Sequence, residues 1–257
     1  MDLKLAGRKA VITGGSKGIG FAAALALAKE GVDVALISRG QAALEAAAAK
    51  IRGQANVAVE ILAADLATKA GVAGAVERFG NADILVNNAG AIPGGNILEV
   101  DGERWRQAWD LKVFGYVDMC RGFFEKMSAR GKGVIVNIIG LAGEKLDHKY
   151  IAGTAGNASL IAFTRALGAG GIDKGVRVVG INPGPVATDR LVTLMKKRAT
   201  DAFGDPERWP ELTKQMPYGR PAHPEEIAPA VCFLASDLSA YTSGVVLTID
   251  GGIAFRG

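Results

Sequence analysis

The chain has 257 residues, of which 49% are hydrophobic and 22% are charged. These shares are close to the average for folded soluble proteins, so they exclude a largely disordered or fibrous chain. The formal net charge is only +4, from 30 basic and 26 acidic residues. The densest basic run, Met195–Arg198, is better interpreted as a solvated helix face than as a nucleic-acid patch, and we expect no nucleic-acid partner.

Short apolar runs alternate with helical patterns along the whole chain. Such runs predict strands buried on both faces, and their alternation with helices predicts an α/β fold with a doubly wound parallel sheet. Helices are predicted over Ile19–Glu30 and Gln41–Ile51. In chain order, the predicted strands are Lys9–Thr13, Val32–Ser38, Val57–Ala63, Ile84–Asn87, Gly133–Ile138, Val176–Asn182 and Val245–Ile249.

No linker, repeat or low-complexity tract interrupts this pattern, so one domain over residues 1–257 is expected. Two cysteines, Cys120 and Cys232, are too few for a disulfide framework, and their apolar surroundings predict buried free thiols in a reducing compartment. The first residues do not have the pattern of a secretory leader, and no apolar run approaches about 18 residues. We therefore expect a soluble, cytoplasmic protein without a membrane partner.

A glycine-rich segment, Thr13–Gly20 (TGGSKGIG), joins the first predicted strand to the first predicted helix. Glycines in this context let the backbone approach a pyrophosphate, and the helix N-terminus favours an anion. A turn without a ligand is the alternative interpretation. The flanking strand and helix favour a nucleotide site.

Later motifs follow in the order of a known family. The spacing Gly14-x-x-x-Gly18-x-Gly20 is followed by Asp65-Leu66, Asn87-Asn88-Ala89-Gly90, Tyr150, Asn182-Pro183-Gly184-Pro185, Thr188, Pro221–Ala228 and Ser243–Gly252. As a set, and over essentially the whole chain, these motifs resemble the short-chain dehydrogenase/reductase family. The resemblance implies a Rossmann-type fold with helices on both faces of the sheet. It divides the domain into a cofactor half, about 1–135, and a catalytic and substrate half, about 136–257.

The end of the second strand favours NADP(H) over NAD(H). Arg39 follows Ser38 where an acidic residue would hold the ribose 2′-hydroxyl of NAD, and Arg39 with Lys17 can bind a 2′-phosphate. The alternative is that Arg39 is an ordinary surface residue. The resemblance implies that Asp65 contacts the adenine, Asn87 the adenosine ribose and Thr188 the nicotinamide amide. The predicted cofactor-binding residues are Gly14, Ser16, Lys17, Gly18, Ile19, Gly20, Arg39, Asp65, Leu66, Asn87, Ala89, Gly90, Pro183, Gly184, Val186 and Thr188.

The resemblance also implies four catalytic positions, of which this chain keeps one. A tyrosine transfers the proton, a lysine four residues later lowers its pKa, a serine polarises the carbonyl and an asparagine anchors a water chain. Tyr150 matches the tyrosine, but Thr154 stands at the lysine position, Gly140 at the serine position and Lys112 at the asparagine position. Gly140 and Tyr150 are ten residues apart, about three fewer than is common in the family.

The paired changes at 112 and 154 suggest that the cation has moved to another helix. Lys112 is expected to reach the space at Thr154 and to lower the pKa of Tyr150, so the predicted catalytic residues are Tyr150, Lys112 and Thr154. A surface lysine is the alternative. Thr154, Asn137 and Asn157 are all open candidates to replace the serine. His148 is interpreted as incidental.

The sequence thus supports two functions. The first is an NADP(H)-dependent oxidoreductase that transfers a hydride between nicotinamide and a ketone or secondary alcohol, with Tyr150 as acid and base. The second is a nucleotide-binding protein that has lost turnover and acts as a sensor or scaffold. Residues 190–215 resemble the family's mobile lid and suit an apolar or aromatic carbonyl substrate. A homotetramer or homodimer is implied by the resemblance, and no metal is expected.

Overall fold

The computed structural model describes residues 2–256, which form an α/β structure around one parallel sheet of seven strands. The strand order is β3-β2-β1-β4-β5-β6-β7, and the reversal between β1 and β4 is the place where doubly wound sheets bind nucleotides. The strands are β1 Lys9–Thr13, β2 Asp33–Ser38, β3 Val59–Ala63, β4 Ile84–Asn87, β5 Gly133–Ile138, β6 Val176–Pro183 and β7 Val246–Ile249. The predicted fold class is confirmed, and a strand forms in each of the seven segments predicted for one.

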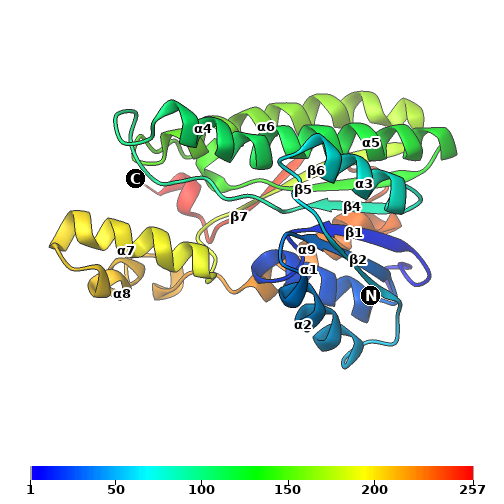
Figure 1. The fold of residues 1–257 in the computed structure, drawn as a ribbon, viewed down its shortest axis with the longest axis horizontal. Helices are drawn as coiled ribbons and strands as arrows, with labels where there is room; N and C mark the ends of the chain where they lie inside the picture. Colours follow the sequence, from blue (N-terminus) through cyan, green and yellow to red (C-terminus); the bar gives the residue numbers. More distant parts are fainter. Residues whose placement is uncertain (1, 257) are drawn as a thin grey trace.

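Helices cover both faces of the sheet (Figure 1). One layer contains α1, α2 and α9, and the other contains α3, α5 and α6, while α7 and α8 extend from one end of the sheet. The helices are α1 Gly18–Lys29, α2 Gln41–Arg52, α3 Lys69–Phe79, α4 Gly102–Trp109, α5 Gly115–Arg130, α6 Ile151–Gly171, α7 Asp189–Phe203, α8 Trp209–Thr213 and α9 Pro224–Ala235.

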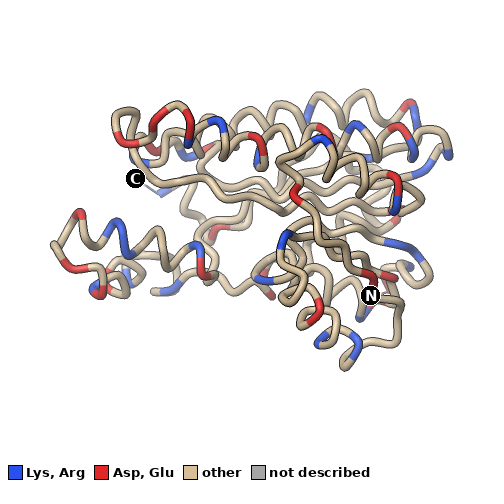
Figure 2. The backbone as a smooth tube through the Cα atoms, viewed as in Figure 1, with Lys and Arg blue, Asp and Glu red and all other residues tan. Residues whose placement is uncertain are grey.

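The inner strands are buried because their side chains pack against both helical layers. In β1, Ile12 points into the core shared with α1 and α9, whereas its neighbour Val11 points into the core shared with α3 and α5. Apolar residues at successive positions are therefore required on both faces. Charged residues lie mostly on the helices and loops around this core (Figure 2).

Both cysteines are free and buried, as predicted. Burial raises the pKa of the Cys120 thiol and of the Cys232 thiol to about 12, so neither is a reactive thiolate at neutral pH. Within residues 2–256, no helix combines the length and the apolar character needed to cross a membrane.

Candidate active site

The glycine turn after β1 leaves room for a ligand because three of its positions require glycine. Gly14 and Gly18 have positive φ angles of 65° and 58°. A Cβ atom on Gly20 would overlap the carbonyl oxygen of Gly14 and the Asn88 amide. Helix α1 then begins at Gly18, and its first turn contains no acidic residue. The turn and the helix N-terminus thus form the kind of backbone cradle that holds a pyrophosphate, and the residues present fit a dinucleotide.

Asn88 and Thr13 fix this turn against the end of β4. The Asn88 side chain donates to the Thr13 and Gly14 carbonyl oxygens at 3.1 and 3.2 Å. The Thr13 hydroxyl accepts hydrogen bonds from the backbone N–H groups of Asn88 and Ala89 at 2.8 and 3.0 Å. Sequence reasoning did not assign a role to Asn88 beyond its motif.

Asn87 differs from the role expected of it. Its side chain is fully buried and donates to Asn137 Oδ1 at 3.0 Å and to the Cys120 sulfur at 3.3 Å. The amide thus stabilises the core between β4, β5 and α5. The prediction that Asn87 contacts an adenosine ribose is therefore corrected.

The far end of the predicted nucleotide site carries the charges expected from the sequence. Arg39 directly follows β2 and Asp65 lies two residues after the neighbouring strand β3, and both are exposed. Lys17 forms an exposed ion pair of 2.7 Å with Asp189, at the start of α7. This pair joins the glycine turn to the start of α7.

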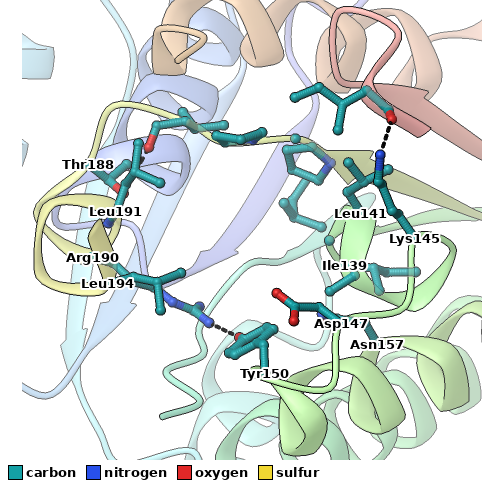
Figure 3. Close-up of a pocket in the computed structure, with 18 of the residues that line it drawn as sticks. Ile139, Leu141, Lys145, Asp147, Tyr150, Asn157, Thr188, Arg190, Leu191 and Leu194 are labelled. Carbon is teal, nitrogen blue, oxygen red and sulfur yellow. Dashed lines mark hydrogen bonds between the residues drawn. The ribbon is translucent and has the colours of Figure 1, made fainter. Parts of the chain in front are cut away.

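A cavity of about 460 Å³ opens beside this cradle, at the carboxyl ends of β5 and β6 (Figure 3). Five residues predicted to bind cofactor line one side of it: Ile19, Pro183, Gly184, Val186 and Thr188. Tyr150, Lys112 and Gly140 also line it. The structure therefore brings the nicotinamide end of the predicted cofactor site together with most of the predicted catalytic positions.

Tyr150 precedes α6 rather than lying within it. It is the N-cap residue, with φ −137° and ψ 41°, and the backbone around it pairs with Gly95. Its side chain is 8% exposed, and Arg190 on α7 donates a hydrogen bond to its hydroxyl. A second Arg190 N–H group bonds the Gly90 carbonyl at 3.1 Å. Burial raises the pKa of Tyr150, and the positive charge of Arg190 opposes that shift.

The Tyr150 ring occupies the space that a side chain at position 153 would fill. A Cβ atom on Gly153 would overlap the ring carbons of Tyr150. Adding the three residues missing from the family spacing moves the expected tyrosine position from 150 to 153. The lysine position, four residues later, then becomes Asn157 instead of Thr154. The Tyr150 ring thus fills the space beside position 153 from one helical turn earlier.

Thr154 does not take the role predicted for it. Its hydroxyl donates to the Asp147 carbonyl at 3.1 Å and accepts from the Asp147 N–H at 3.2 Å. These bonds fix the loop before α6. The prediction that the Lys112 side chain reaches a space at Thr154 is therefore corrected. His148, in the same loop, is exposed.

Lys112 is buried, which excludes the alternative of a surface lysine. It lies in a π-helical turn, Asp110–Phe114, and is 4% exposed. Its amino group donates to the Ile138 carbonyl at 2.7 Å and to the Tyr116 hydroxyl at 2.8 Å. Burial and the charge of Arg190 hold the pKa of Lys112 well below its ordinary value. The cation hydrogen-bonded to Tyr150 is therefore Arg190, and Lys112 contributes a buried amine at the cavity wall.

Arg190 and Asn157 are the site residues that sequence reasoning missed or left open. Asn157 was detectable, because the short distance between Gly140 and Tyr150 already indicated a shift of about three residues. Arg190 had no such signal, since a charged residue at the start of a lid helix is common on any surface. No cluster of three or more His, Cys, Asp or Glu side chains in residues 2–256 is arranged to hold a metal ion.

Comparisons with known proteins give the class to which this fold and site belong. A family model described as enoyl-(acyl carrier protein) reductase matches residues 14–254. Galactitol 2-dehydrogenase (L-tagatose-forming) from Cereibacter sphaeroides is 36% identical, over 97% of this chain and 96% of its own. The chain belongs to the short-chain dehydrogenase/reductase family, whose members matched here are oxidoreductases.

Solved structures agree with this assignment. L-sorbose reductase from Gluconobacter frateurii, complexed with NADPH and L-sorbose, superposes with a TM-score of 0.91 at 35% identity, and all of both chains is covered. An NAD⁺-bound xylitol dehydrogenase superposes with a TM-score of 0.90 at 27% identity, covering 97% of this chain and 100% of its own. The fold is therefore one that holds either nicotinamide cofactor.

Proposed function

We propose that the protein is an NADP(H)-dependent oxidoreductase that interconverts a ketone and a secondary alcohol on a mainly apolar compound. The observation that supports this most strongly is the Tyr150 hydroxyl, hydrogen-bonded to Arg190 within a cavity shared with the predicted nicotinamide end of the cofactor site. A protein that only bound nucleotide would not need a phenol placed in this way.

NADP(H) is favoured by the charges at the far end of the cleft. Arg39 follows β2 where a carboxylate would hold the 2′-hydroxyl of NAD, and Lys17, whose ammonium pairs with Asp189, adds a second positive charge in the glycine turn. A relative of known structure contains NADPH, although another contains NAD⁺. When bound, the cofactor supplies or accepts the hydride.

Tyr150 is the proton donor in this proposal. Burial keeps the phenol protonated at neutral pH, which suits the reduction direction, where it must give a proton to the substrate oxygen. The phenolate that remains is stabilised by the guanidinium of Arg190. Arg190 replaces the cation that the family supplies from the lysine position, and Lys112 holds the β5 end through the Ile138 carbonyl.

Helix α7 supports a substrate with an apolar body. Leu191, Leu194 and Met195 line the cavity from α7, opposite Ile139 and Leu141. The α7 residue Arg198 forms an ion pair with Asp147 at 2.6 Å, which connects the helix to the loop before α6. Few hydroxyl or amide groups face this part of the cavity, so it suits an aliphatic or aromatic carbonyl compound better than a polyol.

A nucleotide-binding protein without turnover is the second candidate. It is favoured by one observation: no serine, tyrosine or lysine stands at positions 140, 153 and 157, which are occupied by Gly140, Gly153 and Asn157. The two candidates differ in whether hydride leaves the bound cofactor.

The deciding experiment follows NADPH oxidation with a panel of aromatic and aliphatic ketones and aldehydes. Tyr150→Phe should lower kcat by about 10²- to 10⁴-fold, because the proton donor is lost, while NADPH affinity measured by fluorescence stays the same. Tyr241→Phe is the matched control, since Tyr241 is fully exposed. Tight NADPH binding without oxidation by any carbonyl in the wild type would support the second candidate.

The proposal includes a cytoplasmic homotetramer or homodimer. Phe114, just before α5, and Leu247 on β7 are 53% and 40% exposed, so both offer apolar surface for subunit contacts. Sedimentation velocity would show a monomer if this part of the proposal fails.

A further inference from the structure

We infer that the side-chain amide of Asn157 is a further catalytic group, which polarises the substrate carbonyl in place of the serine absent at Gly140. This inference rests on the proposed function and names how the same site binds its substrate. Asn157 is 4% exposed and lines the cavity. Its Oδ1 atom has no hydrogen-bond partner within residues 2–256.

A buried amide without partners is costly. Asn87 Oδ1 and Asn182 Nδ2 also lack partners, but each of those side chains is bonded through its other polar atom, whereas the Asn157 side chain makes no hydrogen bond among the described residues. An unsatisfied buried polar group costs about 1–3 kcal/mol. Asn87 and Asn137 bond each other at 3.0 Å, and Asn182 accepts the Gly140 N–H at 3.3 Å. Among the described residues, the Asn157 side chain makes none of these bonds, although it faces a cavity. The Nδ2 group, which is the donor that a carbonyl oxygen needs, is therefore free to donate to a group that enters the cavity.

Gly140 gives this amide its space. The φ angle of 152° at Gly140 belongs to a region that residues with side chains rarely adopt. A Cβ atom at this position would lie 3.2 Å from Asn157 Nδ2 and 3.5 Å from Oδ1. The amide thus stands directly beside the position of the missing serine, where a serine would be both strained and crowded.

Asn157 and Tyr150 approach the cavity from one side of α6. Tyr150 caps the helix and covers Gly153, and Asn157 lies one turn beyond Gly153. Figure 3 shows Tyr150, Asn157 and Arg190 around the same cavity. A carbonyl oxygen between the phenol and the amide would receive two hydrogen bonds, which is the arrangement that stabilises a developing oxyanion.

The reduction step then balances without another reactant. With NADPH bound, its hydride would form the new C–H bond and leave NADP⁺, while the electron pair of the C=O π bond would move to the oxygen, to which the Asn157 N–H would donate a hydrogen bond. The oxygen takes the Tyr150 proton, and Arg190 compensates the phenolate. The amide itself gains and loses no proton.

Carbonyl polarisation can be measured apart from turnover with the probe 4-(dimethylamino)cinnamaldehyde, whose absorbance shifts to longer wavelength when its carbonyl accepts a strong hydrogen bond. NADP⁺ replaces NADPH in this measurement, so no hydride is transferred. The complex of the wild type should show the shift, and Asn157→Ala and Asn157→Asp should lose it. Tyr150→Phe should keep part of it, and the exposed Asn81→Asp is the control.

Kinetics provide the second measurement. With NADPH, Asn157→Ala should lower kcat for this aldehyde by about 10²- to 10³-fold without changing NADPH affinity, and Asn157→Ser should recover part of the loss through its hydroxyl donor. Thermal unfolding shows that each variant is folded. A wild type without the shift, or an Asn157→Ala variant that keeps both the shift and kcat, overturns the inference. A shift that depends on Asn157 without any turnover supports the carbonyl site and rejects the proposed function.

Discussion

The two ends of the cleft are built from different parts of the chain. The end proposed to hold the pyrophosphate is made of backbone, with glycines at 14, 18 and 20 and an amide that bonds carbonyl oxygens of the turn. The catalytic end is made of side chains, and there the family's tyrosine, lysine, serine and asparagine positions carry Gly153, Asn157, Gly140 and Lys112. The first end follows the family pattern, whereas the second departs from it at every position.

This difference shows which part of the site can be built from more than one set of residues. A backbone cradle depends on φ angles and on the absence of Cβ atoms, so few other sequences can form it. A phenol, a cation and a hydrogen-bond donor can reach one cavity from several positions. Here Tyr150 arrives from the helix cap and Arg190 from α7, and both meet in the same cavity.

The largest expected effect comes from breaking the backbone end. Gly20→Ala places a methyl group on the Gly14 carbonyl oxygen, and that backbone atom cannot move away without opening the turn. NADPH affinity should fall by about 100-fold or more, because the cradle depends on this close approach. Gly74→Ala, in the middle of α3 with open space around its Cβ, is the control and should bind NADPH normally. Fluorescence titration measures both, and an unchanged Gly20→Ala variant would contradict the backbone account.

A smaller effect is expected where side chains extend the cofactor site. Arg39→Ala should weaken NADPH binding by about 10- to 100-fold, the value of one or two charge-assisted hydrogen bonds to a phosphate. NADH affinity should stay the same, because NADH has no 2′-phosphate, so the second cofactor is its own control. Equal losses for both cofactors would mean that Arg39 acts on the fold and not on the phosphate.

The elements and the cofactor end could be predicted from the sequence because their signals are local. Each strand is a short apolar run, so β1, β4 and β5 begin and end at the residues predicted for them. The glycine turn is also local, since β1, the turn and the start of α1 all lie within residues 9–20. The exception at this end is Asn87, whose motif gives no sign that its amide turns inward to Asn137.

The catalytic end was less predictable because its contacts join distant segments. Arg190 and Tyr150 are 40 residues apart, and no pattern in the chain links α7 to the cap of α6. The burial of Lys112 depends on the carbonyl of Ile138, 26 residues later. The motif predicts Tyr150 on a helix. In the structure, hydrogen bonds between Thr154 and Asp147 fix the loop before α6, and Tyr150 lies at the N-cap, just before the helix.

The smallest expected effect is on the stability of the protein and not on ligand binding. Lys112 is buried beside a carbonyl and a hydroxyl, and its pKa lies well below the ordinary 10.5. The unfolded chain therefore binds more protons than the folded chain between the lowered pKa and about 10.5, so wild-type stability gains from this group as pH rises through that window. Lys112→Met should remove this gain. The free energy of unfolding of the variant should exceed that of the wild type most at the lowest pH of the window.

Urea unfolding of the ligand-free protein at several pH values measures the difference between wild type and Lys112→Met. Inside the window, the difference in unfolding free energy should change by up to about 1.4 kcal/mol per pH unit, which corresponds to one proton. Lys126→Met, on the exposed face of α5, is the matched control and should run parallel to the wild type. If the unfolding free energy of Lys112→Met also runs parallel to that of the wild type across this pH range, Lys112 is charged in the folded protein. In that case, the catalytic end holds two cations, at Lys112 and Arg190, and the lysine of the family has been moved and not replaced.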